Sequence, residues 1–173
     1  MREWIPISTS PKGRLALAAV TEFGSRSFDE VTVGELSVAA QVTTGAIYHH
    51  FGSKLGLYAF VRDDVERRLL DRMEGAAAAV AGDSNRAGAV TAALLVGLDF
   101  AVGEGLLHLL GTPPPGATHD RLADLLGACT APAPPLLGPI LAAAWRAALA
   151  GVASGSLPEQ ARAALAALEI RIP

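Results

Sequence analysis

Between Thr32 and Ser53 the chain contains three helix start signals, and this crowding limits what the segment can fold into. Thr32 and Glu35 have the spacing of a capping box, in which each residue's side chain binds the backbone amide of the other. Thr43 and Ser53 are further N-cap residues, and Gly52 ends the helix between them. The segment therefore predicts two short helices joined by a tight turn, followed by a third helix.

The rest of the chain also has the three- and four-residue apolar spacing of helices. Ser10 is placed to cap a helix that has Pro11 at its first position. Helices are expected over 11–24, 32–40, 43–51, 54–74, 85–103, 106–110, 119–129, 136–154 and 158–170, with a hinge at 76–82 and loops at 112–116 and 130–135. No segment alternates apolar and polar residues as a half-buried strand would, so we predict an all-α fold.

Length and composition suit one or two small folded domains. The chain has 173 residues, of which 51% are hydrophobic, enough for a buried core. Charge thins and alanine dominates after Gly75. We predict a three-helix head over 1–55, joined by a long fourth helix to a small helical body over 56–173. The single cysteine, Cys129, argues against a disulfide framework and a multi-cysteine metal cluster.

Charge is distributed unevenly along the chain. The net charge of −3 argues against a protein that coats nucleic acid indiscriminately. From Leu36 to Val61, however, there is no acidic residue, and Lys54 and two histidines lie in that stretch. The stretch coincides with the short helices, which together have helix-turn-helix architecture.

In a helix-turn-helix motif the second helix enters the major groove and reads base edges with residues near its N-terminus. Here that helix begins Thr43-Thr44-Gly45-Ala46, and Tyr48 and His49 follow one turn later. Ile47 and Phe51, four residues apart, are expected to face the core. The small polar start therefore predicts a surface that can approach DNA closely.

The run Ala39-Ala40-Gln41-Val42-Thr43-Thr44-Gly45-Ala46-Ile47-Tyr48-His49-His50-Phe51-Gly52-Ser53-Lys54 resembles the DNA-binding signature of TetR-family transcriptional regulators. The resemblance covers residues 11–60. Beyond them the chain fits the family only in outline, as a helical ligand-binding and dimerisation body.

The resemblance implies a role for each matching residue. Thr43 and Thr44 match positions that contact phosphate and base edges, and Gly45 matches one where bare backbone lies against a base. Tyr48 and His49 match groove-facing positions. Lys54 matches a phosphate-binding lysine, and Thr32 matches a cap that touches the DNA backbone.

Two positions depart from the family pattern, because Gln41 and Ser27 stand where glycine is usual. If the backbone there is left-handed, each substitution costs about 1 kcal/mol. The N-terminal arm is poorly basic, with only Arg2, Lys12 and Arg14 as cations, so a minor-groove arm is not indicated.

Each DNA-binding assignment has a plainer alternative. Tyr48 could be a half-buried core residue, and Lys54 could be a solvated helix start, although a cation there is disfavoured by the helix dipole unless phosphate is near. His49 and His50 are adjacent on a helix and point about 100° apart, so they cannot readily share a metal ion. We therefore predict no metal site.

In the body, four residues are candidates to line an effector site: Asp99, Phe100, His108 and Trp145. Asp99 is either a partly buried acid with a partner or a residue of an exposed face, and Trp145 could equally be core or dimer interface. No nucleophile, base and orienting group have catalytic spacing, so we predict no enzyme activity and no cofactor.

Two functional hypotheses remain. The first is a ligand-responsive regulator, a repressor, which binds a palindromic operator in double-stranded DNA as a homodimer and is released by a small apolar or amphipathic effector. The second is a small-molecule-binding helical protein that no longer reads DNA, which the net charge, the poorly basic arm and Gln41 favour. The longest uncharged stretch, Leu125–Trp145, is broken by four prolines, so we expect a cytoplasmic protein with no membrane partner.

Overall fold

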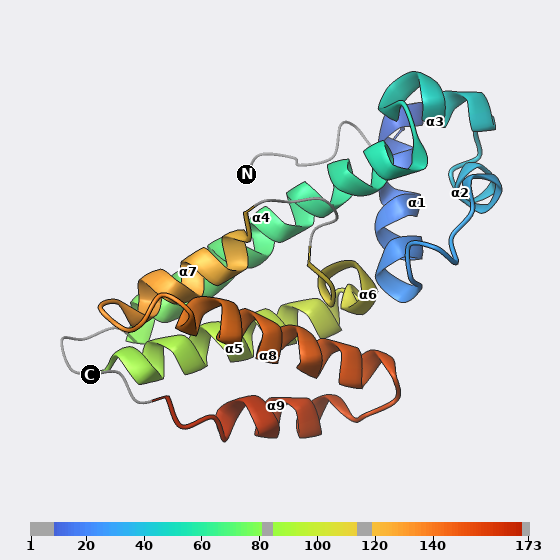
Figure 1. Ribbon diagram of the computed structural model, residues 1–173. Helices are drawn as coiled ribbons and strands as arrows, with labels where there is room; N and C mark the ends of the chain where they lie inside the picture. The colour runs from blue at the N-terminus through green and yellow to red at the C-terminus, as the bar shows by residue number, and fades with distance from the viewer. Residues whose placement is uncertain (1–8, 81–84, 114–118, 171–173) are drawn as a thin grey trace.

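The computed structural model describes residues 9–80, 85–113 and 119–170, and every regular element in those ranges is an α-helix (Figure 1). The helices are α1 (Pro11–Ser25), α2 (Val33–Ala39), α3 (Thr44–Phe51), α4 (Lys54–Val80), α5 (Arg86–Gly103), α6 (Leu107–Leu110), α7 (Arg121–Thr130), α8 (Leu137–Ala153) and α9 (Pro158–Ala166). The predicted all-α fold is confirmed. The predicted hinge at 76–82 and loop at 112–116 lie partly outside the described residues.

The head consists of α1, α2 and α3, and local caps set where these helices begin. The Ser10 hydroxyl accepts from the Gly13 amide at 3.0 Å, with Pro11 at the start of α1. Thr32 and Glu35 form both halves of the predicted capping box at α2. Each helix then buries apolar side chains against the other two, so the short α2 and α3 are held by packing.

The turn between α2 and α3 places Gln41 in the left-handed region, with a φ of 54°. A residue other than glycine there costs about 1 kcal/mol, so this departure from the family pattern is a real strain. The Gln41 amide donates to the Val38 carbonyl and the Val42 amide to the Ser37 carbonyl, each at 3.0 Å. Ser27 does not have a positive φ, and its backbone therefore does not require glycine.

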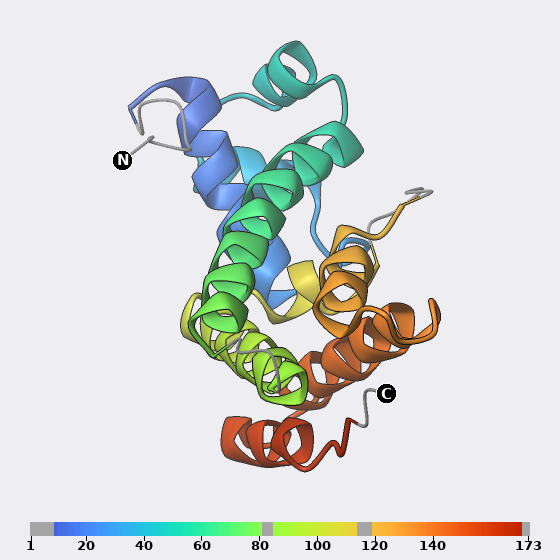
Figure 2. The ribbon, with the colours of Figure 1, turned by 90° about the vertical axis from the view of Figure 1, so that its left-hand side faces the viewer.

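The long α4 connects the head to the body. Gly52 ends α3 with a φ of 74°, and the Ser53 hydroxyl caps α4 by accepting from the Gly56 amide at 2.9 Å. Figures 1 and 2 show α4 running from α3 down to the far end of α5. It continues past the predicted end at residue 74 because the alanines after Gly75 are strong helix formers. A boundary at residue 55 falls within its first turn.

The body is built around α5, which packs against α4, α7, α8 and α9. Its length and composition would allow it to cross a membrane, but its apolar character is accounted for by these four neighbours. The α7 and α8 helices pack closely where Gly138 meets Gly127: a Cβ on Gly138 would lie 2.2 Å from the Ala123 carbonyl oxygen.

Head and body also meet at a second place, away from α4. There the end of α1 packs against α6 and the turn before it. A Cβ on Gly24 would lie 2.3 Å from the carbonyl oxygen of Gly105, so the two backbones touch. The α3 helix lies at one end of the molecule and α9 at the other in both views (Figures 1 and 2).

Candidate nucleic-acid interface

The start of α3 leaves its polar groups free. Thr43 occupies the N-cap position with extended backbone, but its side chain makes no capping hydrogen bond. The first amides of a helix have no partner within the helix. The Thr43 hydroxyl and the amides of Thr44 and Gly45 are therefore available to an acceptor from outside, while the Ala46 amide donates to the Thr43 carbonyl at 3.0 Å. Free amides at a helix N-terminus are the arrangement that binds phosphate.

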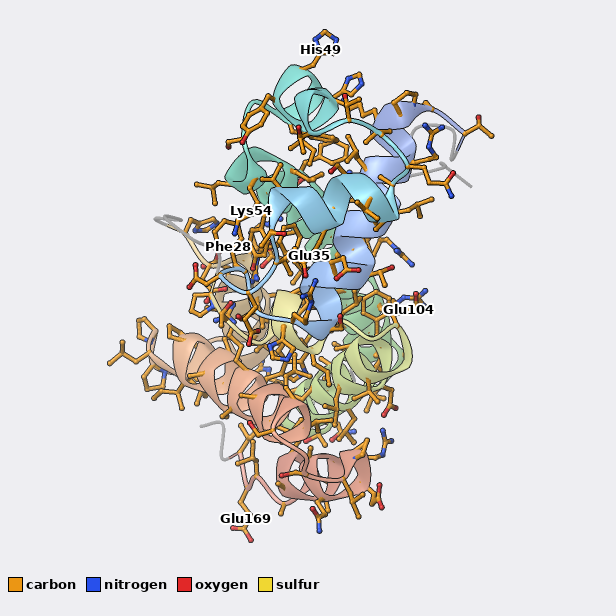
Figure 3. The ribbon with its side chains drawn as sticks, turned by 90° about the vertical axis from the view of Figure 1, so that its right-hand side faces the viewer. Phe28, Glu35, His49, Lys54, Glu104 and Glu169 are labelled. Atoms are coloured by element: carbon orange, nitrogen blue, oxygen red, sulfur yellow. The ribbon has the colours of Figure 1, made fainter. Side chains whose placement is uncertain are left out.

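The outward face of α3 carries the residues expected to meet DNA. Thr43, Thr44, Gly45 and His49 are exposed, and the Tyr48 side chain is 56% exposed. Figure 3 shows His49 at the outer end of the head, pointing away from the body. No described part of the chain covers this face, so it is open to a groove.

The opposite face of α3 holds the helix on the head. Ile47 is fully buried, and Phe51 packs against Phe60 with ring centroids 5.3 Å apart. Lys12 lies over both of these rings, at 5.7 and 5.1 Å from their centroids. Sequence reasoning missed this role because it placed Lys12 with the basic residues of an arm.

Thr32, predicted to touch the DNA backbone, is exposed but engaged in its own cap. Its amide and hydroxyl each donate to the Glu35 carboxylate at 2.7 Å. The hydrogen bond from the Thr32 side chain, followed by that from Arg26, lowers the pKa of Glu35 from 4.5 to about 2. Arg26 also binds Glu22 at 2.5 Å, so it ties the end of α1 to the start of α2.

Lys54 lies where sequence reasoning expected a phosphate contact, but its ammonium group is bonded inside the protein. The Nζ atom donates to the carbonyls of Phe28 and Val31 at 2.8 and 2.9 Å. It also lies 4.1 Å from the centroid of the Phe28 ring. Figure 3 shows the two side chains together beside α4. Lys54 thereby fixes the segment between α1 and α2 to the first turn of α4, a role that no local pattern indicates.

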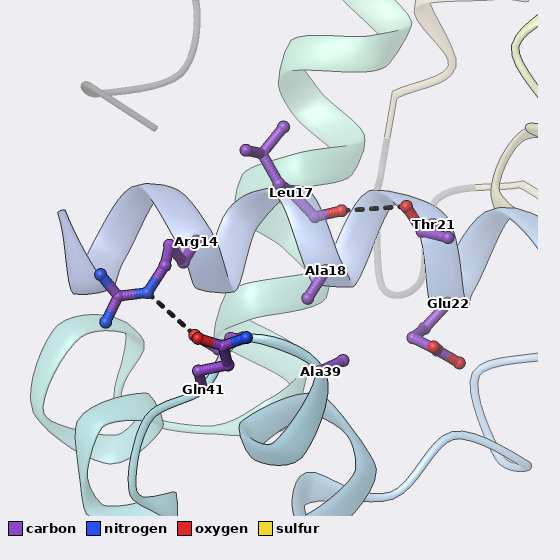
Figure 4. Close-up of a pocket in the computed structure, with 8 residues that line it drawn as sticks. Arg14, Leu17, Ala18, Thr21, Glu22, Ala39 and Gln41 are labelled. Carbon is purple, nitrogen blue, oxygen red and sulfur yellow. Dashed lines mark hydrogen bonds between the residues drawn. The ribbon is translucent and has the colours of Figure 1, made fainter. Parts of the chain in front are cut away.

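Arg14 has a similar internal role on the other side of the head (Figure 4). Its Nε donates to the Ala40 carbonyl at 2.9 Å and one terminal nitrogen donates to the Thr9 carbonyl at 2.7 Å. This side chain borders an open hollow of about 410 Å³ between α1 and the strained turn at Gln41. Arg14 therefore supports the turn that aims α3.

The four residues predicted to line an effector site do not come together. Asp99 is exposed and pairs with Arg162 of α9 at 2.5 Å, so the exposed-face alternative is correct. Phe100 is nearly buried beneath the guanidinium of Arg72, 4.9 Å from the ring centroid. Trp145 is fully buried, and its indole nitrogen donates to the Leu94 carbonyl at 3.1 Å, as a core residue does.

His108 lines a cavity, but at a place that sequence reasoning did not indicate. This junction cavity, of about 310 Å³, lies between the 27–29 segment of the head, α6 and the end of α8. Its apolar wall consists of Phe28, Tyr58, Leu107, Ala150 and Ala153. No sequence pattern indicates the cavity, because its walls are distant along the chain.

The outer side of α8 and α9 is apolar. Leu136 and Ile140 are 71% and 60% exposed, and exposed alanines continue the same stripe along α8 at three- and four-residue steps. Beside the stripe, a groove of about 440 Å³ runs between α8 and α9 with alanine and leucine walls. The stripe consists of Leu136, Ile140, Ala143, Ala147 and Ala150. We call this stripe and the groove beside it the α8–α9 face.

The comparisons with known proteins agree with this architecture. Residues 16–60 match the model of the family described as bacterial regulatory proteins, tetR family. No curated protein sequence matches the chain. The fold is similar to the crystal structure of a TetR family transcriptional regulator, PfmR from Thermus thermophilus. That match has a TM-score of 0.54 and 19% identity, and covers 95% of this chain and 100% of that one.

At 19% identity the structural match supports only the fold, and the family model covers only the head and the start of α4. Residues 16–60 are therefore similar to the N-terminal domain of the tetR family of bacterial regulatory proteins, and the fold of the whole chain is similar to that of a TetR family regulator.

Proposed function

We propose that this protein is a transcriptional repressor that binds a palindromic operator as a homodimer and is released by a small-molecule effector. The observation that carries the DNA-binding part is the outward face of α3. That face is exposed, lacks acidic residues and begins with an N-cap hydroxyl and helix amides that have no partner within the helix. A helix end of this kind attracts phosphate, while side chains one turn later can reach bases.

Within this interface the residues divide by role. Thr43 and Thr44 bind phosphate and base edges, and Gly45 lets the backbone approach closely. Tyr48 and His49 extend into the groove. Lys54 and Thr32 act mainly as positioning residues, because the first ties the inter-helix segment to α4 and the second is engaged in its cap.

The α8–α9 face supports a homodimer. A stripe that exposes Leu136, Ile140 and alanines is the kind of surface that packs closely against a second helix. In Figures 1 and 2, α9 lies at the end of the molecule opposite α3, so pairing through this face leaves the reading helices uncovered. Two such helices read successive half-sites when they are about 34 Å apart.

Release by an effector requires a second conformation of the body, in which the distance between the two reading helices no longer matches the spacing of the half-sites. An effector shifts that equilibrium only by its difference in affinity between the two conformations. The α4 helix is suited to carry the change because its first turn holds the head and its remainder packs on α5.

The direct test is fluorescence anisotropy with labelled DNA from upstream of the protein's own gene. We expect saturable binding by the unaltered chain and loss of specific binding by the Thr44→Ala, Tyr48→Ala double variant. Thr21→Ala, on the exposed side of α1, is the matched control and should bind normally. Unchanged binding by the double variant would refute this reading face.

The second candidate is a helical ligand-binding protein that does not read DNA. The net charge of −3 and the internal use of Lys12, Arg14 and Lys54 favour it, since few cations remain for phosphates. Its signature is absence of DNA binding even at low salt, where nonspecific binding is strongest, together with retained ligand binding.

A further inference from the structure

Arg62, on α4, is a buried cation whose observed partners are all neutral. The residue is only 3% exposed. One terminal nitrogen donates to the Leu109 carbonyl and to the Tyr58 hydroxyl, the latter at 3.2 Å, and the other donates to the Thr112 carbonyl at 2.6 Å. The Nε atom is buried without a hydrogen-bond partner among the described residues.

No carboxylate in the described part of the chain pairs with Arg62. The acids that follow it on α4 are bonded to other arginines: Asp63 and Glu66 to Arg121, and Asp64 to Arg67. A buried charge is normally paired, because carbonyl and hydroxyl dipoles replace only part of the hydration that it loses. The site is therefore electrostatically incomplete.

The incomplete site lies directly behind the junction cavity. Tyr58 and Thr112, which both bind the Arg62 guanidinium, also line the cavity wall. Besides Tyr58, the titratable side chains that line the cavity are Asp29 and His108. Asp29 belongs to the segment between α1 and α2, while Arg62 lies on α4 and donates to the Leu109 carbonyl of α6.

We propose that the junction cavity binds a small amphipathic carboxylate. Its carboxylate pairs with the planar guanidinium of Arg62 by displacing the Thr112 carbonyl or the Tyr58 hydroxyl, since two parallel N–H donors match a carboxylate. Its hydrocarbon part lies against Phe28, Leu107 and Ala153. At about 310 Å³ the cavity is at the small end of ligand sites, which favours a short-chain or single-ring acid.

The position of the cavity gives the ligand a route to the reading helix. Phe28 lines the cavity. Its ring and its backbone carbonyl also contact the ammonium group of Lys54. Lys54 begins α4 directly after the Gly52 and Ser53 caps of α3 and α4. A ligand that displaces Phe28 therefore loosens the contact that aims α3. This regulatory consequence rests on the proposed function, whereas binding of the carboxylate does not.

The test is isothermal titration calorimetry on the full chain without DNA, near neutral pH. The probes are butanoate, hexanoate, octanoate and benzoate, each compared with its primary amide. We expect at least one acid to bind saturably and its amide to bind about tenfold or more weakly, because the amide lacks the charge that Arg62 pairs with. Absence of binding by every acid, or equal binding of acid and amide, would overturn the proposal.

Variants locate the site. Arg62→Met should reduce acid binding to the level of the amide, and Ala153→Phe should remove binding of both by filling the cavity. Arg162→Met is the matched control, because that arginine is exposed on α9, and it should bind as the unaltered chain does. If Arg62→Met does not fold by circular dichroism, Ala153→Phe and the acid–amide comparison decide alone. Unchanged acid binding in Ala153→Phe would place the ligand elsewhere and contradict the assignment.

A parallel anisotropy titration separates the two proposals. Acid binding without any DNA binding would refute the proposal of a DNA-binding regulator but not the carboxylate site in the junction cavity. DNA binding without acid binding would refute the carboxylate site but not the regulator. When both occur, we expect the bound acid to weaken DNA affinity, and unchanged affinity at saturating acid would contradict the proposed route through Phe28.

Discussion

Among single residues, Lys54 shows that a lysine expected to bind phosphate can instead be bonded inside the protein. Its ammonium group holds two carbonyls and an aromatic ring of the segment between α1 and α2. A lysine at a positive helix end is disfavoured unless something negative compensates it, and here the carbonyl oxygens do so. This contact ties the segment between α1 and α2 to the first turn of α4, which directly follows α3.

Lys54→Met should lower the free energy of unfolding by about 1.5–3 kcal/mol, the usual value for hydrogen bonds to a charged group. Operator affinity should fall, but the slope of log affinity against log salt should stay the same, because no phosphate contact is lost. A lysine that binds phosphate would instead reduce that slope by about one when removed. Urea denaturation and anisotropy at several salt concentrations measure the two quantities, and a reduced slope with unchanged stability would restore the phosphate assignment.

Among the helices, α2 responds to pH because Glu35 closes its capping box. The pKa of this carboxyl is lowered from 4.5 to about 2, because the ionised form accepts hydrogen bonds from Thr32 and Arg26. The unfolded chain therefore binds a proton more readily than the folded one, so this stabilisation is complete above about pH 4.5 and is lost as pH falls through about 2.

Glu35→Gln should consequently make stability less dependent on pH in that window. Glutamine can still reach the Thr32 amide, so the box keeps its geometry but loses its titrating group. Thermal unfolding followed by circular dichroism between about pH 5 and 2 measures the difference. If stability falls equally with pH in the unaltered chain and in Glu35→Gln, the role assigned to Glu35 is contradicted.

The packing of α7 on α8 depends on the absence of a side chain at Gly138. Gly138→Ala should destabilise the fold by about 1–3 kcal/mol, because the new Cβ would meet backbone that cannot move freely. Gly75→Ala in α4 is the matched control: nothing lies within 4 Å of its Cβ, and it should stabilise the helix by about 0.5–1 kcal/mol. Equal effects of the two substitutions in urea denaturation would refute the close contact.

Helix starts were predictable from sequence because caps are local. The capping box at Thr32 and the caps at Ser10 and Ser53 appear as expected, and α3 begins at its predicted position even though Thr43 makes no side-chain cap. What the sequence could not supply was the arrangement of distant segments. The internal contacts of Lys54 and the position of the junction cavity both depend on how the head packs on the body.

For the molecule as a whole, the proposed repressor requires two subunits, and we expect them to join through the α8–α9 face. Ala147 is exposed in the middle of the α8 stripe and also lines the groove beside it. Ala147→Glu should therefore convert dimer to monomer and abolish operator binding, because a charge at the centre of an apolar interface would be buried without a partner. Ala78→Glu, exposed near the end of α4, is the control. Sedimentation velocity measures the oligomeric state. An unaltered dimer in the Ala147→Glu variant would exclude the α8–α9 face as the dimer interface.

Whether two α3 helices read one operator can be decided by hydroxyl-radical footprinting of the protein on its upstream DNA. We expect two protected tracts on the same face of the duplex, with centres about 10 base pairs apart or at a multiple of that spacing. Both tracts should disappear together in the Thr44→Ala, Tyr48→Ala variant. A single tract, protection that the variant retains, or no protection at low salt would show that the paired helices do not read DNA in this way.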